Sequence, residues 1–258
     1  MSESTTTAYD EVPAASVPAY LIYIVLDTSK SMWRTPRGGN PASTPMEVFK
    51  RNIPRMLLKL ALDPLVNQLT SISVVAFNDR PEVLRPIGSL EHAATIRPPS
   101  KGFGTDYRGV LRFLIGQHRK DVRDVKLSRA RENYPIDVAR PWIFFITDGR
   151  AYAQGVDQPD SAWLPERDEL AGPPIGARVV TLGLPGADED ALWLLATGDD
   201  HGSRNAFIAN DPRDTVALSA GVCTAIGSSI GASTGSGTLI IKPPPGMSQV
   251  RGPRRARG

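Results

Sequence analysis

The chain alternates between apolar runs of strand length and stretches whose apolar residues recur at helical spacing. Apolar runs typical of strands buried on both faces of a sheet occur at residues 20–26, 70–77, 141–147, 177–184 and 206–209. Helices are predicted at residues 46–60, 107–118, 160–170, 189–195 and 211–228. This alternation predicts an α/β fold, a doubly wound, Rossmann-like three-layer α/β/α sandwich with a mostly parallel central sheet.

Three details refine this prediction. Residues 78–81 form a turn before a short strand at 82–84, so one antiparallel edge strand is expected. Pro54 lies inside the helix at 46–60 and is expected to kink it unless a second helix starts there. The stretch 119–140, with seven basic and four acidic residues, is either an extension of the preceding helix or an inserted loop. A solvated face is favoured there over a surface for docking a partner.

Oxygen-bearing side chains directly follow the first apolar run. Asp27 is succeeded by Ser29 and Ser31, at positions i, i+2 and i+4. Ligands of parallel α/β sheets bind at the carboxyl ends of the strands, and on a loop this alternation can aim all three oxygens at one point. Oxygen ligands without His or Cys suit a hard cation such as Mg2+, Mn2+ or Ca2+. We therefore expect a metal site at this edge of the sheet.

Two later stretches complete a pattern that resembles a known family. Residues 102–106 form a Gly-rich loop containing Thr105, and a second apolar run ends at Asp148 followed by Gly149. An Asp-x-Ser-x-Ser sequence, a loop Thr and an apolar strand ending in Asp-Gly resemble the von Willebrand factor A (VWA) domain. The resemblance extends from about residue 18 to about residue 229. Within the family, the chain is most similar to the bacterial VWA proteins associated with tellurite resistance, on the segments 26–32, 74–78 and 145–149.

The resemblance implies a metal-ion-dependent adhesion site made of Asp27, Ser29, Ser31, Thr105 and Asp148. In the family the hydroxyls often bind the ion directly, at least one acid acts through water, and an Asp or Glu of a protein partner fills an open position. Because few carboxylates contact the ion directly, its charge is poorly quenched and attracts the incoming acid. The implied cofactor is Mg2+, or else Mn2+ or Ca2+.

The resemblance also implies a function. It is that of a non-enzymatic adaptor or scaffold that binds a protein partner through the ion. The tellurite-resistance-type relatives further imply a bacterial cytosolic stress-response or phospho-signalling assembly, with a protein kinase or phosphatase system as partner.

One position departs from the family pattern. Family members commonly have Gly between the two serines, where this chain has Lys30. Gly tolerates backbone conformations that Lys does not. The Lys30 ammonium would either weaken the affinity for a cation or help to hold an acidic partner.

Composition sets the expected domain boundaries. The hydrophobic fraction of 41% and the charged fraction of 22% are ordinary for one soluble globular domain. We expect a disordered N-terminal segment at residues 1–17, the VWA domain at 18–230, and a flexible linker with a basic disordered tail at 231–258. The tail carries five basic residues and no acid, and without them the formal charge of +3 becomes about −2. The basicity therefore belongs to the tail.

Cysteine usage and the N-terminus predict a cytoplasmic location. Cys223 is the only cysteine, which excludes an intrachain disulfide and favours a reducing compartment. The first 17 residues lack the basic start and apolar core of a secretory signal. No stretch has the roughly 20 apolar residues that a membrane helix needs, so no membrane partner is expected.

Two other classes of function stay open. A strand-end Asp27 beside Mg2+ is also the arrangement of aspartyl phosphatases, so a metal-dependent phosphoester hydrolase is an alternative. Those enzymes use a second acid as proton donor two residues after the nucleophile, where this chain has Ser29. Nucleic acid is expected as a partner only through the basic residues of the tail at 254–257, in a salt-sensitive manner.

Other polar residues are expected to serve the fold. Asp106 follows the loop threonine and is expected to cap the next helix. Asp79 is expected to serve its turn, and residues 199–201 (Asp-Asp-His) to form a surface turn between glycines. His92 and His118 are isolated in the sequence.

Overall fold

The computed structural model describes residues 16–35, 44–90, 95–131, 135–198, 203–210, 215–236 and 239–252. Its strands are β1 (Val17–Asp27), β2 (Thr70–Phe77), β3 (Pro81–Arg85), β4 (Ile136–Val138), β5 (Trp142–Thr147), β6 (Tyr152–Ala153), β7 (Val156–Asp157), β8 (Arg178–Gly183), β9 (Ala206–Ala209) and β10 (Met247–Gln249). Its helices are the 3-10 helix η1 (Lys30–Trp33) and the α-helices α1 (Pro45–Ala61), α2 (Pro64–Leu69), α3 (Tyr107–Arg131), α4 (Asp160–Ala171), α5 (Glu189–Leu195) and α6 (Thr215–Ser236).

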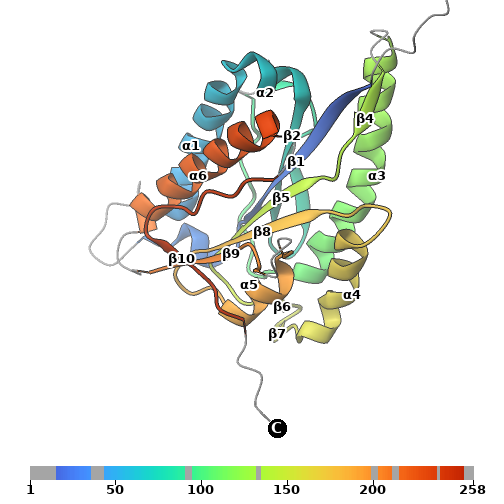
Figure 1. Ribbon diagram of the computed structural model, residues 1–258. Helices are drawn as coiled ribbons and strands as arrows, with labels where there is room; N and C mark the ends of the chain where they lie inside the picture. Colours follow the sequence, from blue (N-terminus) through green and yellow to red (C-terminus); the bar gives the residue numbers. More distant parts are fainter. Residues whose placement is uncertain are drawn as a thin grey trace, which may run out of the picture.

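These elements form three layers, as the sequence predicts. An eight-stranded sheet lies in the middle. Helices α1, α2 and α6 cover one face of it, and α3, α4 and α5 cover the other (Figure 1). The predicted Rossmann-like α/β/α sandwich is confirmed.

Strand β1 occupies the centre of the sheet. The strand order is β10-β9-β8-β5-β1-β2-β3, and β4 pairs with the first residues of β1. Neighbours from β9 to β2 run parallel, while β3 and β10 run antiparallel at the two edges. The antiparallel strand predicted at 82–84 is confirmed as β3. A second antiparallel edge strand, β10, was not predicted.

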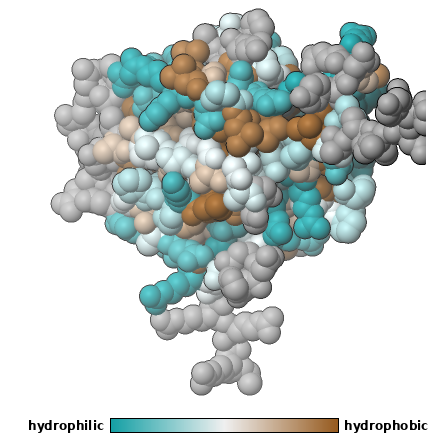
Figure 2. Space-filling view, turned by 45° about the horizontal axis from the view of Figure 1, so that its top comes forward, coloured by the Kyte–Doolittle hydropathy of each residue, from teal (hydrophilic) through white to brown (hydrophobic). Residues whose placement is uncertain are grey.

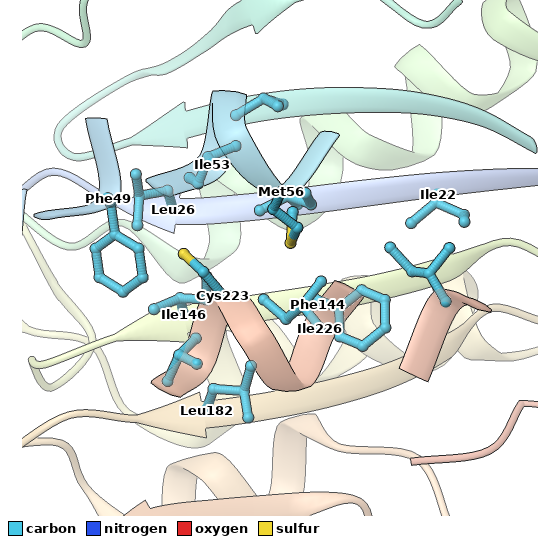
Figure 3. Packing of buried hydrophobic residues seen from close by; sticks show 14 of the residues in the cluster. Ile22, Leu26, Phe49, Ile53, Met56, Phe144, Ile146, Leu182, Cys223 and Ile226 are labelled. Atoms are coloured by element: carbon cyan, nitrogen blue, oxygen red, sulfur yellow. The ribbon is translucent and has the colours of Figure 1, made fainter. Parts of the chain in front are cut away.

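Both faces of β1 are buried, which explains its unbroken apolar sequence. Ile22 and Ile24 belong to the apolar cluster under α1 and α6. Leu21, Tyr23 and Val25 belong to the cluster under α3 and α4. Figure 3 shows the first cluster, in which side chains of β1, β5 and β8 meet those of α1 and α6. A charge on either face would be buried without a partner, at a large cost.

The first two helices begin at capping residues. The Thr44 hydroxyl accepts a hydrogen bond from Glu47 N, and α1 continues as one helix past Pro54. Asp63 ends this helical region and caps α2, since its carboxylate accepts hydrogen bonds from Leu65 N and Val66 N. A second helix thus starts directly after Asp63, and α2 leads directly into β2.

The polar stretch 119–140 is largely a helix extension. Helix α3 continues to Arg131, and β4 follows and pairs with the start of β1. Asp121 is the buried exception on this helix. Its carboxylate accepts hydrogen bonds from Tyr23 Oη at 3.0 Å and Gln117 Nε2 at 2.7 Å.

The C-terminal region differs from the predicted linker. Helix α6 continues through Ser236, across most of the Gly/Ser-rich segment 231–237. Its hydroxyls hold the chain that follows: Ser229 Oγ accepts a hydrogen bond from Lys242 N at 2.9 Å, and Ser233 Oγ accepts one from Ile240 N at 2.7 Å. Small polar residues that predict flexibility serve here as acceptors on a helix surface.

The described part of the predicted tail is also ordered into the fold. Met247 and Val250 are buried, and β10 pairs with β9 at the edge of the sheet. Disorder at 239–252 is therefore a wrong prediction. Residues 1–15 and 253–258 lie outside the described ranges, and Val17 already begins β1.

Apolar side chains are exposed at the end of the molecule where α2 lies. Leu58, Leu62 and Leu65 belong to this region, and Leu62 is 82% exposed. Figure 2, turned to bring this end forward, shows apolar surface interspersed with hydrophilic surface. Within the described ranges, no helix combines the length and apolar character that crossing a bilayer requires.

Candidate metal centre

The five residues predicted as metal ligands come from three segments that meet at one edge of the sheet. Asp27 is the last residue of β1, and Asp148 follows the end of the adjacent β5. Ser29 Oγ lies 3.0 Å from Ser31 Oγ, which donates a hydrogen bond to Asp148 Oδ1 at 2.7 Å. The first and third segments are thus linked through oxygen atoms.

Asp27 is fully buried and held at both oxygens. Its Oδ1 accepts a hydrogen bond from Ser29 N at 2.8 Å, and its Oδ2 accepts one from Thr147 Oγ1 at 2.6 Å. Burial raises the pKa of Asp27 to about 6, although these hydrogen bonds act in the opposite direction. The sequence pattern does not single out Thr147, because its role depends on the pairing of β1 with β5.

Thr105 reaches the same space from the second segment. It pairs with Tyr152 through two backbone hydrogen bonds, of 2.7 and 3.0 Å. A Cβ atom built on Gly149 would lie 3.2 Å from Thr105 Oγ1 and 3.6 Å from Asp27 Oδ2. The absence of a side chain at Gly149 therefore leaves a small space between the Thr105 hydroxyl and the Asp27 carboxylate.

The loop that carries Thr105 is fixed by residues at the end of β2. Asn78 Nδ2 donates to Thr28 Oγ1 and Ser100 O, both at 3.0 Å. The Asp79 carboxylate accepts the backbone N–H groups of residues 103 and 104 at 2.8 Å each. The Asp79 carboxylate thus serves this distant loop, while the Asn78 side chain serves the turn by accepting a hydrogen bond from Arg80 N at 3.1 Å.

Glycine is required at two positions of this loop. A Cβ atom on Gly102 would lie 2.3 Å from Asn78 Cγ, and one on Gly104 would lie 2.4 Å from Asp79 Oδ1. The two glycines of the Gly-x-Gly sequence therefore leave the room that the Asn78 and Asp79 side chains occupy.

Asp148 has a pKa shifted further than that of Asp27. Burial and the charge of Asp27 raise the pKa of Asp148 to about 7, against the hydrogen bond from Ser31 and the charge of Arg34. Two neighbouring carboxylates in a poorly solvated site resist being ionised together. A bound cation would remove this penalty, because it favours the ionised forms.

The residues present fit a hard divalent cation. In an octahedral Mg2+ site with ligands at about 2.1 Å, adjacent oxygens are about 3.0 Å apart. The Ser29–Ser31 and Ser31–Asp148 oxygen pairs, at 3.0 and 2.7 Å, match this spacing. Among the described residues there is no group of three or more His, Cys, Asp or Glu that could hold a metal. The ligand set would therefore rest on hydroxyls as much as on acids.

Lys30 contacts an aromatic ring of the Gly-rich loop. Its side chain is exposed, and its Nζ lies over the ring of Phe103, 5.5 Å from the ring centroid. The ammonium group is thus engaged by an aromatic ring on the outer surface of the loop.

The remaining polar candidates serve the fold where they are described. Asp106 caps α3, as predicted, by accepting Gly109 N at 2.8 Å. His118 Nδ1 lies 3.4 Å from Tyr23 Oη, and burial lowers its pKa. His92 and the acidic turn at 199–201 lie outside the described residues.

No family model matches the chain, and no curated protein does. Solved structures do match. One is proximal thread matrix protein 1 from the mussel byssus, with 15% identity and a TM-score of 0.52 over 84% of this chain and 48% of that one. Another is a von Willebrand factor type A structure from Catenulispora acidiphila, with 16% identity and a TM-score of 0.50 over 80% of this chain and 43% of that one. The chain thus spans less than half the length of these two.

A third similar structure is a domain of comparable size. It is the vWF domain of the type V pili tip protein Mfa5 from Porphyromonas gingivalis, with 14% identity and a TM-score of 0.52 over 86% of this chain and 97% of that one. At such low identity, the similarity concerns the course of the backbone. The chain therefore has the three-layer α/β fold of the von Willebrand factor A domain.

Proposed function

We propose that this chain is a non-enzymatic protein-binding module that holds a divalent cation, Mg2+ foremost, at Asp27, Ser29, Ser31, Thr105 and Asp148. One observation carries the proposal. Two carboxylates at the ends of adjacent strands share a cluster of hydroxyls, and neither forms an ion pair with a cationic side chain of the described residues. A cation from solution would satisfy this arrangement.

The proposed roles of the five side chains differ with their charge and burial. The bound ion supplies a positive charge that attracts an Asp or Glu of the partner. Ser29, Ser31 and Thr105 offer neutral oxygens, which leave that charge largely unquenched. Asp27 is suited to act through water, because both of its oxygens already accept hydrogen bonds. Asp148 is less buried and stands beside Ser31.

The setting that we propose follows from the sequence resemblance. It is a role as adaptor or scaffold in a bacterial cytoplasmic assembly for stress response or phospho-signalling, of the tellurite-resistance type. A protein kinase or phosphatase system would then be the partner.

A phosphoester hydrolase is the weaker candidate. Its nucleophile would be Asp27, which is fully buried and hydrogen-bonded at both carboxylate oxygens. The position of the proton donor is held by Ser29, whose hydroxyl is not an acid that could protonate a leaving group. The site therefore offers neither an accessible nucleophilic carboxylate at Asp27 nor an acid that could serve as proton donor at position 29.

Calorimetric titration with Mg2+ tests the metal half of the proposal. The wild type should bind one ion, and Asp148→Ala and Ser31→Ala should lose or weaken that binding. Asp137→Asn is the matched control, since Asp137 is exposed on β4, away from the carboxyl ends of the strands.

A pull-down with the immobilised protein tests the proposed binding of a protein partner through the ion. A partner retained in Mg2+ should be lost in EDTA and with Asp148→Ala, and kept with Asp137→Asn. Equal retention in all four cases would contradict a metal-bridged contact.

A further inference from the structure

A cation and an aromatic ring stand together beside the metal centre. Ser29 and Gly102 form a parallel bridge, and Gly102 N donates to Thr28 O at 3.3 Å. The next residues along the two segments, Lys30 and Phe103, are therefore neighbours. Lys30 Nζ lies over the Phe103 ring, as already described.

The exposure of Phe103 is enforced by the loop beneath it. Its side chain is 76% exposed, although burying a Phe would gain about 2 kcal/mol. The loop cannot turn inward, because Asp79 binds the N–H groups of Phe103 and Gly104 and because Gly102 is packed against Asn78. A rigid, exposed aromatic residue is typical of the centre of a binding interface.

The two segments that meet here also carry exposed basic residues, Lys30 and Arg34 after β1 and Lys101 just before Gly102, which we call the basic rim. None of them is in an ion pair with a carboxylate of the described residues. Asp79, which contacts this loop from the end of β2, accepts hydrogen bonds from its backbone N–H groups. This rim therefore carries positive charge that an acidic partner can neutralise.

From this geometry we infer that the module recognises a segment with two acidic residues. One acid binds the metal centre, and the second pairs with Lys30, held on the ring of Phe103. The inference rests on the proposed function, and it specifies what the partner must carry. Lys30 then acts as a specificity residue, since a lone acid would satisfy the ion without using it.

The spacing of the two acids follows from the chain geometry. Lys30 is the sequence neighbour of both Ser29 and Ser31, and consecutive Cα atoms are about 3.8 Å apart. A bound segment in extended conformation advances about 3.3 Å per residue. The second acid is therefore expected within a few residues of the first.

Selection from a phage-displayed library of random 12-residue peptides tests this inference. The protein is used whole, once in Mg2+ and once in EDTA, and the selected peptides are sequenced. The wild type in Mg2+ should enrich peptides with two acids at that spacing. Lys30→Met should still enrich the first acid but lose the preference for the second, and Lys30 is exposed, so the variant should fold.

Lys59→Met is the matched control. It removes the same charge from an exposed position near the end of α1, and should select the same two acids as the wild type. A synthetic peptide of the selected sequence should bind the wild type about fivefold more tightly than its version with Gln at the second acid. With Lys30→Met, the two peptides should bind equally.

The possible failures separate the two proposals. Enrichment of a single acid in Mg2+ by the wild type, or a second acid that persists with Lys30→Met, would overturn the role of Lys30 and leave the metal-dependent module intact. Absence of any Mg2+-dependent enrichment would overturn the proposed function, and this inference with it.

Discussion

Two single residues of the proposed metal site, Asp27 and Asp148, carry an electrostatic penalty that a bound cation would relieve. Burial raises the pKa of Asp27 to about 6 and that of Asp148 to about 7, above the value of about 3.9 for an unfolded Asp. Groups with a raised pKa favour the folded state fully below the unfolded pKa, and this contribution is lost as pH rises through the folded pKa. Without metal, the free energy of unfolding therefore falls as the pH rises from about 4 to about 7, and it stays reduced above that pH.

Asp148→Asn should remove part of this pH dependence. In EDTA at pH 8, the variant should melt about 3 to 6 °C above the wild type, while at pH 4.5 the two should differ little. Excess Mg2+ at pH 8 should raise the melting temperature of the wild type alone. Thermal melts of both proteins in these three conditions measure this, and a variant less stable than the wild type in EDTA at pH 8 would contradict it.

Residue chemistry explains which parts of the site the sequence could predict. Asp27, Ser29, Ser31 and Asp148 lie where apolar runs end, so pattern and donor type together predict a shared site. Thr147 sits inside a strand, and nothing in its sequence context marks it as a hydrogen-bond donor to Asp27. Such contacts depend on which strands become neighbours.

At the scale of elements, the loop from Gly102 to Thr105 and the turn after β2 form one unit. Asn78 and Asp79 hold the loop through side-chain hydrogen bonds, and the glycines leave room for those side chains. The sequence predicts both the loop and the turn, but it gives no sign that they touch.

Gly104→Ala and Asp79→Ala should reveal this coupling. Gly104→Ala should destabilise the fold by about 1 to 3 kcal/mol, because its methyl group would overlap the Asp79 carboxylate. Asp79→Ala removes both that overlap and two hydrogen bonds, so the double variant should lose less than the sum of the singles. Urea denaturation measures all three.

Gly88→Ala is the control for the loop. No atom lies within 4 Å of a Cβ atom built there, so it should be close to neutral. Strict additivity of the Gly104 and Asp79 variants would contradict the coupling.

At the scale of the whole molecule, elements made mostly of apolar residues could be predicted from sequence, and two three-residue strands could not. Strands β2 and β9 and helix α5 have the predicted bounds, because most of their residues are apolar. Strands β4 and β10 have three residues each, too few to show a period. Each forms by pairing with another strand: β4 pairs with the first residues of β1, and β10 pairs with the free edge of β9.

Truncation after Gly237 tests the contribution of the C-terminal segment. It removes β10 with the buried Met247 and Val250, so the protein should lose about 3 to 5 kcal/mol of unfolding free energy. Truncation after Gly252, which retains them, is the matched control. Equal stability of the two truncated chains would show that β10 contributes nothing.

The central position of β1 has a consequence for how the protein is made. Ser31 and Asp148 are 117 positions apart, yet they share a hydrogen bond. At a synthesis rate of about 10 residues per second, Asp148 leaves the ribosome roughly 12 s after Ser31. During that interval the nascent chain has Asp27 and the two serines but lacks Asp148, the second acid of the proposed metal site. Under the proposed function, cation binding therefore becomes possible only after β5 has been synthesised and has paired with β1.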